Sequence, residues 1–103
     1  MRLLVLAVLA TFCLTAAAAA RAESPTKPAR LGLCAACHGE DGRARMKATP
    51  HLAGQDLEYL KIALAAYKSG ARDIPVMRAA VGALTPAELD ELAAWYSAQV
   101  REP

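Results

Sequence analysis

Two cysteines and a histidine lie within five residues, in the segment Cys34-Ala35-Ala36-Cys37-His38. On a helix, residues three apart share a face, so both thiols can reach the two vinyl groups on one edge of a porphyrin. The histidine that follows can then bind the iron as the proximal ligand. Cys-x-x-Cys-His is the attachment pattern of a c-type haem. The segment therefore predicts one covalent haem c, with its iron held by His38.

Three other uses of a Cys-x-x-Cys segment fit this sequence less well. A thioredoxin-like dithiol follows a strand in a βαβ unit, and we find no convincing strand in the sequence. A zinc site needs four ligands, and only His38 and His51 could join the two cysteines. A structural disulfide would leave His38 without a role. We therefore expect haem attachment.

An iron bound by one histidine has either a sixth ligand or an open site. Met77 is far along the chain from His38, in a Pro-containing segment that we expect to be a loop crossing the other haem face. Met46 lies in a basic run, so we expect it to be exposed. We favour Met77 as the second iron ligand, with Met46, His51 or an open site as alternatives. A thioether favours ferrous iron and raises the reduction potential, and a saturated iron leaves no place for oxygen to bind.

The first 22 residues have the pattern of a secretory signal peptide. Arg2 precedes an apolar run, and Ala20-Arg21-Ala22 is a small-x-small cleavage pattern. The alternative is an uncleaved membrane anchor, because the apolar stretch is just long enough to span a bilayer. We expect cleavage, which leaves residues 23–103 as one domain and removes Cys13 with the leader.

Residues 23–103 form a short chain that can bury only a limited core. A haem would supply much of the missing apolar volume, so we expect folding to be coupled to haem attachment. Without Arg2 and Arg21, ten basic and ten acidic residues remain, and the net charge falls from +2 to about zero. This balance offers no basic face for nucleic acid, and we expect no stable membrane insertion after cleavage.

The patterns predict an all-α domain of about four short helices. The first should begin near Pro28, run through the Cys-x-x-Cys-His segment and end at Gly39. A loop over 40–55 should lead to a helix over 56–69. Its apolar stripe has helical spacing and consists of Leu57, Leu60, Leu64 and Tyr67.

The C-terminal part should contain a loop and two further helical pieces. We expect a loop over 74–77 and a short helical turn over 78–82. The last helix has the clearest start, because Thr85 can cap it, Pro86 suits its first position and Glu88 can complete a capping box. The expected buried face of this helix is Leu89, Leu92, Ala93, Tyr96 and Val100, with Trp95 on its flank.

The chain from about Arg30 to Gln99 resembles class I monohaem cytochromes c of the bacterial c4 and c553 type. The matching segments are Cys34-Ala-Ala-Cys-His38-Gly39, Pro50-His-Leu-Ala-Gly-Gln55, Tyr59-Leu60, Tyr67-Lys-Ser-Gly70-Ala-Arg72, Met77, and Leu92-Ala-Ala-Trp-Tyr96. One departure is Gly32, which lies closer to the motif than the glycine at which the family's terminal helices usually cross. Cytochrome c4 itself carries two such domains, and this chain carries one.

The resemblance implies a class I cytochrome c fold around one haem, with Met77 as the axial methionine. It also implies that Pro50 accepts a hydrogen bond from the other ring nitrogen of His38 through its backbone carbonyl. Covalent haem attachment outside the bacterial inner membrane would make the protein periplasmic. Arg72, Tyr59 and Trp95 are candidate partners for the haem propionates.

The expected function is one-electron transfer between redox protein donors and acceptors, without bond chemistry. The main alternative is a haem c subunit of an oxidoreductase complex, such as flavocytochrome c sulfide dehydrogenase. A ligand-binding haem sensor is a third possibility, and it requires that Met77 does not bind the iron.

Overall fold

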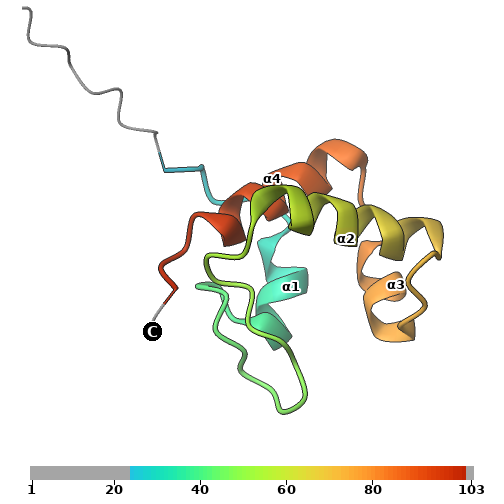
Figure 1. The fold of residues 1–103 in the computed structure, drawn as a ribbon, viewed down its shortest axis with the longest axis horizontal. Helices are drawn as coiled ribbons and strands as arrows, with labels where there is room; N and C mark the ends of the chain where they lie inside the picture. Colours follow the sequence, from blue (N-terminus) through green and yellow to red (C-terminus); the bar gives the residue numbers. More distant parts are fainter. Residues whose placement is uncertain (1–23, 102–103) are drawn as a thin grey trace, which may run out of the picture.

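The computed structural model describes residues 24–101, which form four helices joined by loops, with no strand among them (Figure 1). The helices are α1 (Leu31–His38), α2 (Leu57–Ser69), α3 (Pro75–Val81) and α4 (Pro86–Ser97). None of the helices in this range is long and apolar enough to cross a membrane. The all-α prediction is confirmed, whereas the signal-peptide prediction for residues 1–22 lies outside the described residues.

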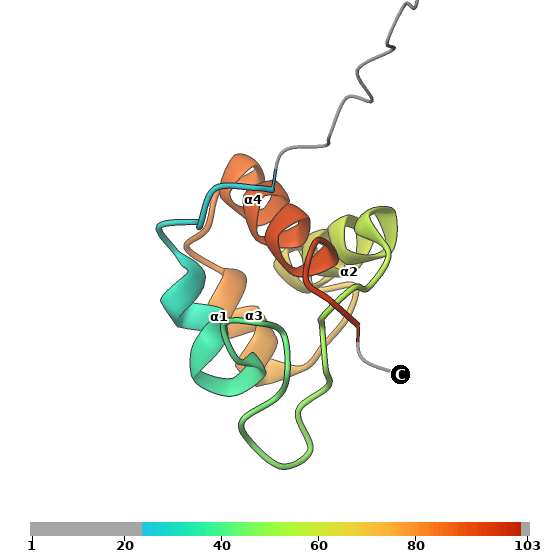
Figure 2. The same ribbon diagram turned by 90° about the vertical axis from the view of Figure 1, so that its left-hand side faces the viewer.

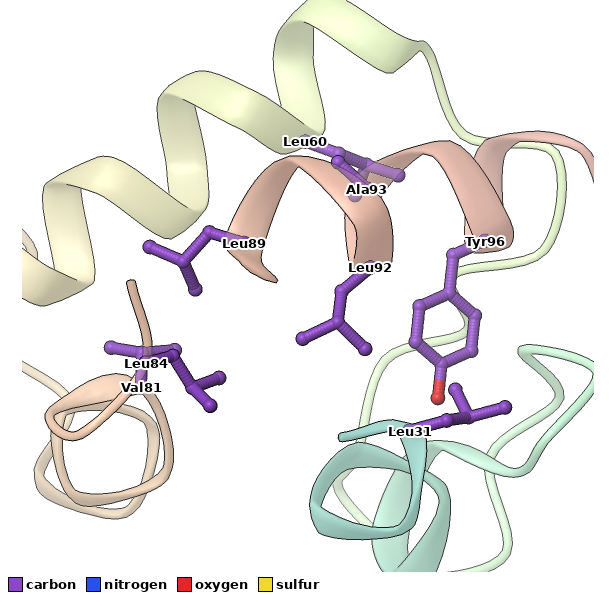
Figure 3. Close-up of a cluster of buried hydrophobic side chains, with 8 residues drawn as sticks. All are labelled: Leu31, Leu60, Val81, Leu84, Leu89, Leu92, Ala93 and Tyr96. Atoms are coloured by element: carbon purple, nitrogen blue, oxygen red, sulfur yellow. The ribbon is translucent and has the colours of Figure 1, made fainter. Parts of the chain in front are cut away.

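Helices α2 and α4 pack against each other, and α1 and α3 lie on one side of this pair (Figures 1 and 2). The buried cluster between them draws half of its members from α4 (Figure 3). Its residues are Leu31, Leu60, Val81, Leu84, Leu89, Leu92, Ala93 and Tyr96. Each helix contributes at least one residue, so this small core is the surface on which all four helices are placed.

Helix α2 begins and ends as its sequence predicts. The Asp56 carboxylate accepts a hydrogen bond from Tyr59 N at 2.9 Å, which satisfies one of the free N–H groups of the first turn. Gly70 follows the last turn with φ 86°, the left-handed conformation that commonly ends a helix. Helix α1 is shorter at its start than predicted, because it begins at Leu31 rather than near Pro28.

The prediction of a loop over 74–77 is wrong, because α3 already begins at Pro75. The proline takes the first helical position, where its missing N–H would have no intrahelical partner and its fixed φ suits the helix. Ile74 provides the extended residue before it. Met77 therefore lies in the first turn of a helix, which holds its backbone more firmly than a loop would.

The start of α4 confirms the predicted capping box. Glu88 N donates to the Thr85 hydroxyl at 3.2 Å, and Thr85 N donates to the Glu88 carboxylate at 3.1 Å. These hydrogen bonds lower the pKa of Glu88, which also pairs with Arg30 at 3.0 Å and so joins α4 to the start of α1. The predicted burial of Val100 is wrong, because α4 ends at Ser97 and Val100 is 76% exposed.

We predict that Thr85→Ala destabilises the protein by about 1 kcal/mol, because the substitution removes a helix cap. In a domain of this size the melting temperature should fall by about 4–8 °C, measured by circular dichroism on the haem-loaded protein. Thr26→Ala is the control, since Thr26 is exposed and its hydroxyl makes no hydrogen bond within residues 24–101. Equal melting temperatures for the two variants would contradict the capping role.

Candidate functional site

His38 is the last residue of α1 and is buried, with 6% of its surface exposed. Its Nδ1 lies 2.9 Å from the backbone oxygen of Pro50. A carbonyl can only accept a hydrogen bond, so Nδ1 carries the proton and donates. In this tautomer Nε2 has the free lone pair, which is the form of histidine that binds a metal ion. The expected contact between His38 and Pro50 is therefore present.

Cys34 and Cys37 lie one turn apart on α1, and both are free and partly exposed. Burial raises the pKa of the Cys34 thiol above its ordinary value. A thioredoxin-like dithiol needs the opposite, since its attacking cysteine has a lowered pKa. The two thiols and the His38 ring that follows them fit the donor set of a covalent haem.

Gly39 turns the chain sharply away from the end of α1. Its φ of 77° and ψ of 154° lie in a region that essentially only glycine adopts. A Cβ atom here would collide with the backbone oxygen of Arg43. The residue after His38 must therefore be glycine for the following loop to fold back beside α1.

The loop over 39–54 is closed by its own backbone hydrogen bonds. Gly42 O accepts from Leu52 N at 2.7 Å and from Ala53 N at 3.1 Å, which joins its first and last parts. Arg45 N donates to Cys37 O at 2.9 Å and holds the middle of the loop against α1. These contacts bring Pro50 back to His38, although twelve residues separate the two in sequence.

Two neighbouring aromatic residues of α4 hold the start of this loop. The Tyr96 hydroxyl donates to Gly39 O at 2.9 Å, and Trp95 Nε1 donates to Glu40 O at 2.7 Å. Because the indole has a single N–H, Trp95 has no donor left for a haem propionate. Both aromatics lie on the predicted last helix, but the sequence predicts neither contact, because both depend on how α4 crosses the loop.

Met77 lies on α3, separate from the loop that holds His38, and is partly buried against the core cluster. Surface contacts anchor both ends of its helix. Arg78 pairs with Asp73 at 3.0 Å before α3, and Lys68 of α2 donates to Gly82 O at 3.0 Å after it. Helices α1 and α3 lie on the same side of the α2–α4 pair (Figures 1 and 2), so the expected ligands come from two helices that share one side of the molecule.

The two alternative sixth ligands are placed less favourably than Met77. Met46 is 55% exposed, as expected. His51 is exposed, and its Nδ1 accepts a hydrogen bond from Ala44 N at 2.9 Å. The free lone pair of the neutral His51 ring is therefore already used, which leaves its other nitrogen protonated.

Residues 24–101 contain no group of three or more His, Cys, Asp or Glu side chains that could hold a metal ion. Two open hollows of about 300 and 270 Å³ lie between residues 25–29 and α4 and between α2 and the start of α4. Neither is lined by a cysteine, a histidine or Met77.

Comparison with known proteins finds one matching family and several similar proteins. The profile of the family described as cytochrome c matches residues 29–97. Cytochrome c-554(548) of Halomonas halodenitrificans is 34% identical over 73 residues, which cover 68% of this chain and 88% of the relative. Cytochrome c4 of Pseudomonas aeruginosa is 32% identical over 96% of this chain, and the thiosulfate dehydrogenase electron acceptor of Stutzerimonas stutzeri is 38% identical over 74% of it.

A solved structure shares the fold. Acidithiobacillus ferrooxidans cytochrome c4 superimposes with a TM-score of 0.58 and 33% identity over 62% of this chain. The chain spans 49% of the Pseudomonas aeruginosa cytochrome c4, 35% of the Stutzerimonas stutzeri protein and 37% of the solved structure.

We predict opposite effects for two glycine substitutions in and beside α1. Gly39→Ala should destabilise the haem-loaded protein by about 1–3 kcal/mol or more, because alanine cannot adopt this conformation without strain. Gly32→Ala is the matched control. A Cβ atom at Gly32 would meet nothing within 4 Å, and alanine in a helix is more stable than glycine by up to about 1 kcal/mol. Denaturant unfolding measures both, and a neutral Gly39→Ala would contradict the strained turn.

Proposed function

The chain belongs to the cytochrome c family and has the class I cytochrome c fold, and on this basis we propose that it is a periplasmic one-electron carrier. Family membership implies covalently bound haem c with its iron. When bound, haem c supplies a one-electron couple at its iron. The residues of this chain would hold the haem and set the reduction potential of that couple.

His38 is the residue that carries the proposal. Its Nδ1–H is held by the Pro50 carbonyl at 2.9 Å, so Nε2 is left to bind the iron and the ring has a fixed orientation. A hydrogen bond of this kind also makes a histidine a stronger electron-pair donor to a metal ion. Cys34 and Cys37, on the same helix, would hold the haem through thioether bonds.

Met77 would complete the coordination as the sixth ligand. It lies on a helix anchored at both ends. Apart from His38, no other methionine or histidine of residues 24–101 combines partial burial with a free ligand atom. A methionine on this side would exclude external ligands from the iron and raise the reduction potential. The site would then exchange electrons and bind no gas, which separates a carrier from a sensor.

The name of one relative supports redox proteins as the partners of this chain. The Stutzerimonas stutzeri relative is named an electron acceptor of thiosulfate dehydrogenase, which pairs a similar protein with another redox protein. We propose redox proteins as the electron donor and acceptor of this chain. The signal-like pattern of residues 1–22 and the cytochrome c4 relatives support a periplasmic location.

We predict that the haem stays on the polypeptide through both Cys34 and Cys37. Haem staining after denaturing electrophoresis should label the wild-type chain, and acidic acetone should not extract the colour. Cys34→Ala and Cys37→Ala should each lower the yield of haem-loaded protein several-fold, because this small core depends on its cofactor. Ala36→Ser, at an exposed position between the cysteines, should retain wild-type yield. Complete extraction from wild type would contradict covalent attachment.

We predict that Met77 binds the iron in both oxidation states. The oxidised wild type should show the weak far-red sulfur-to-iron absorption band, and the ferrous protein should resist carbon monoxide at neutral pH. Met77→Ala should lose the band, bind carbon monoxide and have a lower reduction potential, because the preference of the thioether for ferrous iron is lost.

Met46→Ala serves as the control for Met77→Ala and should change none of these properties, since Met46 is exposed. Rapid and complete binding of carbon monoxide by ferrous wild type would favour the sensor and contradict the carrier.

A further inference from the structure

Tyr96 contacts both ends of the loop over 39–54. Its hydroxyl donates to Gly39 O at 2.9 Å, at the start of the loop. Its own backbone oxygen accepts from Gly54 N at 3.0 Å, at the end of the loop. One residue of α4 therefore sets the distance between the two ends of the segment that carries Pro50.

The hydroxyl contact is made inside the protein. Tyr96 is 3% exposed and belongs to the core cluster, and its hydroxyl points away from α4 towards the α1 side (Figure 3). Burial raises the pKa of Tyr96, so its O–H is protonated and can donate at neutral pH. A buried hydrogen bond holds its partner firmly, because water cannot replace it.

A short chain of hydrogen bonds leads from this hydroxyl to the His38 ring. Gly39 O also accepts from Gly42 N at 3.3 Å, and Gly42 O accepts from Leu52 N at 2.7 Å. Leu52 lies two residues after Pro50, whose oxygen accepts from His38. Gly39 itself directly follows His38. Tyr96 is therefore linked to the histidine by two routes, one through Gly39 and one through the loop that carries Pro50.

We infer that Tyr96 is a positioning residue for His38, holding the loop so that the Pro50 carbonyl meets the Nδ1–H of the iron ligand. The inference rests on the proposed function of His38 as that ligand. Tyr96 makes no hydrogen bond to His38 Nδ1 or to Pro50 O and acts through the loop backbone. The loss of its hydroxyl should therefore change the histidine as well as the stability.

The test is Tyr96→Phe in the haem-loaded full chain, which keeps the ring and removes one buried donor. Leu89→Val is the matched control, because it weakens the same core at the α2 side of α4 without touching the loop (Figure 3). Two properties report on His38: hydrogen exchange of its Nδ1–H, followed by NMR, and the reduction potential. The melting temperature reports on stability alone.

Tyr96→Phe should speed exchange of the His38 Nδ1–H by about tenfold or more, because Gly39 O keeps only its longer hydrogen bond from Gly42 N and the loop opens more often. The reduction potential should rise, since a less firmly hydrogen-bonded histidine is a weaker donor to ferric iron. Leu89→Val should lower the melting temperature and leave both properties of His38 at wild-type values.

Unchanged exchange and potential in Tyr96→Phe, or equal changes in Leu89→Val, would overturn the inference and leave the proposed function intact. Failure of the proposed function itself would show in a separate measurement on the wild type. If the His38 ring proton of the oxidised wild type shows no shift caused by the paramagnetic iron, His38 is not the ligand, and the positioning role falls with it.

Discussion

A histidine can bind a metal ion through one ring nitrogen only in the tautomer that protonates the other, and something must hold that proton. In this protein the partner is the backbone carbonyl of Pro50, 2.9 Å from His38 Nδ1. A backbone acceptor cannot titrate or rotate away as a side chain can. The contact instead requires that a whole loop returns to the end of α1, and much of the remaining structure serves that return.

Helix α4 makes contacts that hold both ends of this loop, although it carries none of the expected iron ligands. One face of α4 forms half of the buried cluster and packs on α2. At its C-terminal end, Trp95 and Tyr96 extend the same helix to the carbonyls of Glu40 and Gly39. The core and the His38 loop are thereby held by one rigid element, so the small apolar core also stabilises the geometry of the site.

The two expected ligands of the iron are supported in physically different ways. On the His38 side, backbone hydrogen bonds and two aromatic donors hold the loop. On the Met77 side, the contacts at the ends of α3 include the exposed pair between Arg78 and Asp73 and the lysine contact from Lys68. Exposed ion pairs contribute little to stability. Helix α3 is therefore held mainly by its packing, since its Val81 is 1% exposed in the core cluster.

The features of this protein that depend on neighbouring residues can be predicted from its sequence. The Cys34–His38 segment, the capping box of Thr85 and Glu88 and the glycine end of α2 are all local patterns, because each needs only residues within a few positions of one another. The family resemblance added the partnership of Pro50 with His38, which the structure places at 2.9 Å. Pro75 shows the limit of local patterns, since a proline fits both the predicted loop and the first turn of the observed helix.

The contacts between groups far apart in the chain depend on how the helices pack. That Tyr96 joins both ends of the loop over 39–54 follows from the angle at which α4 crosses that loop, and no spacing along the chain encodes this angle. The same packing exposes Val100, because α4 ends before it. Hydrogen bonds between residues more than fifty positions apart, such as that from Tyr96 to Gly39, depend on the summed packing of the whole core. A local sequence pattern therefore predicts the ligands, while the packed fold determines how firmly the expected residues are held.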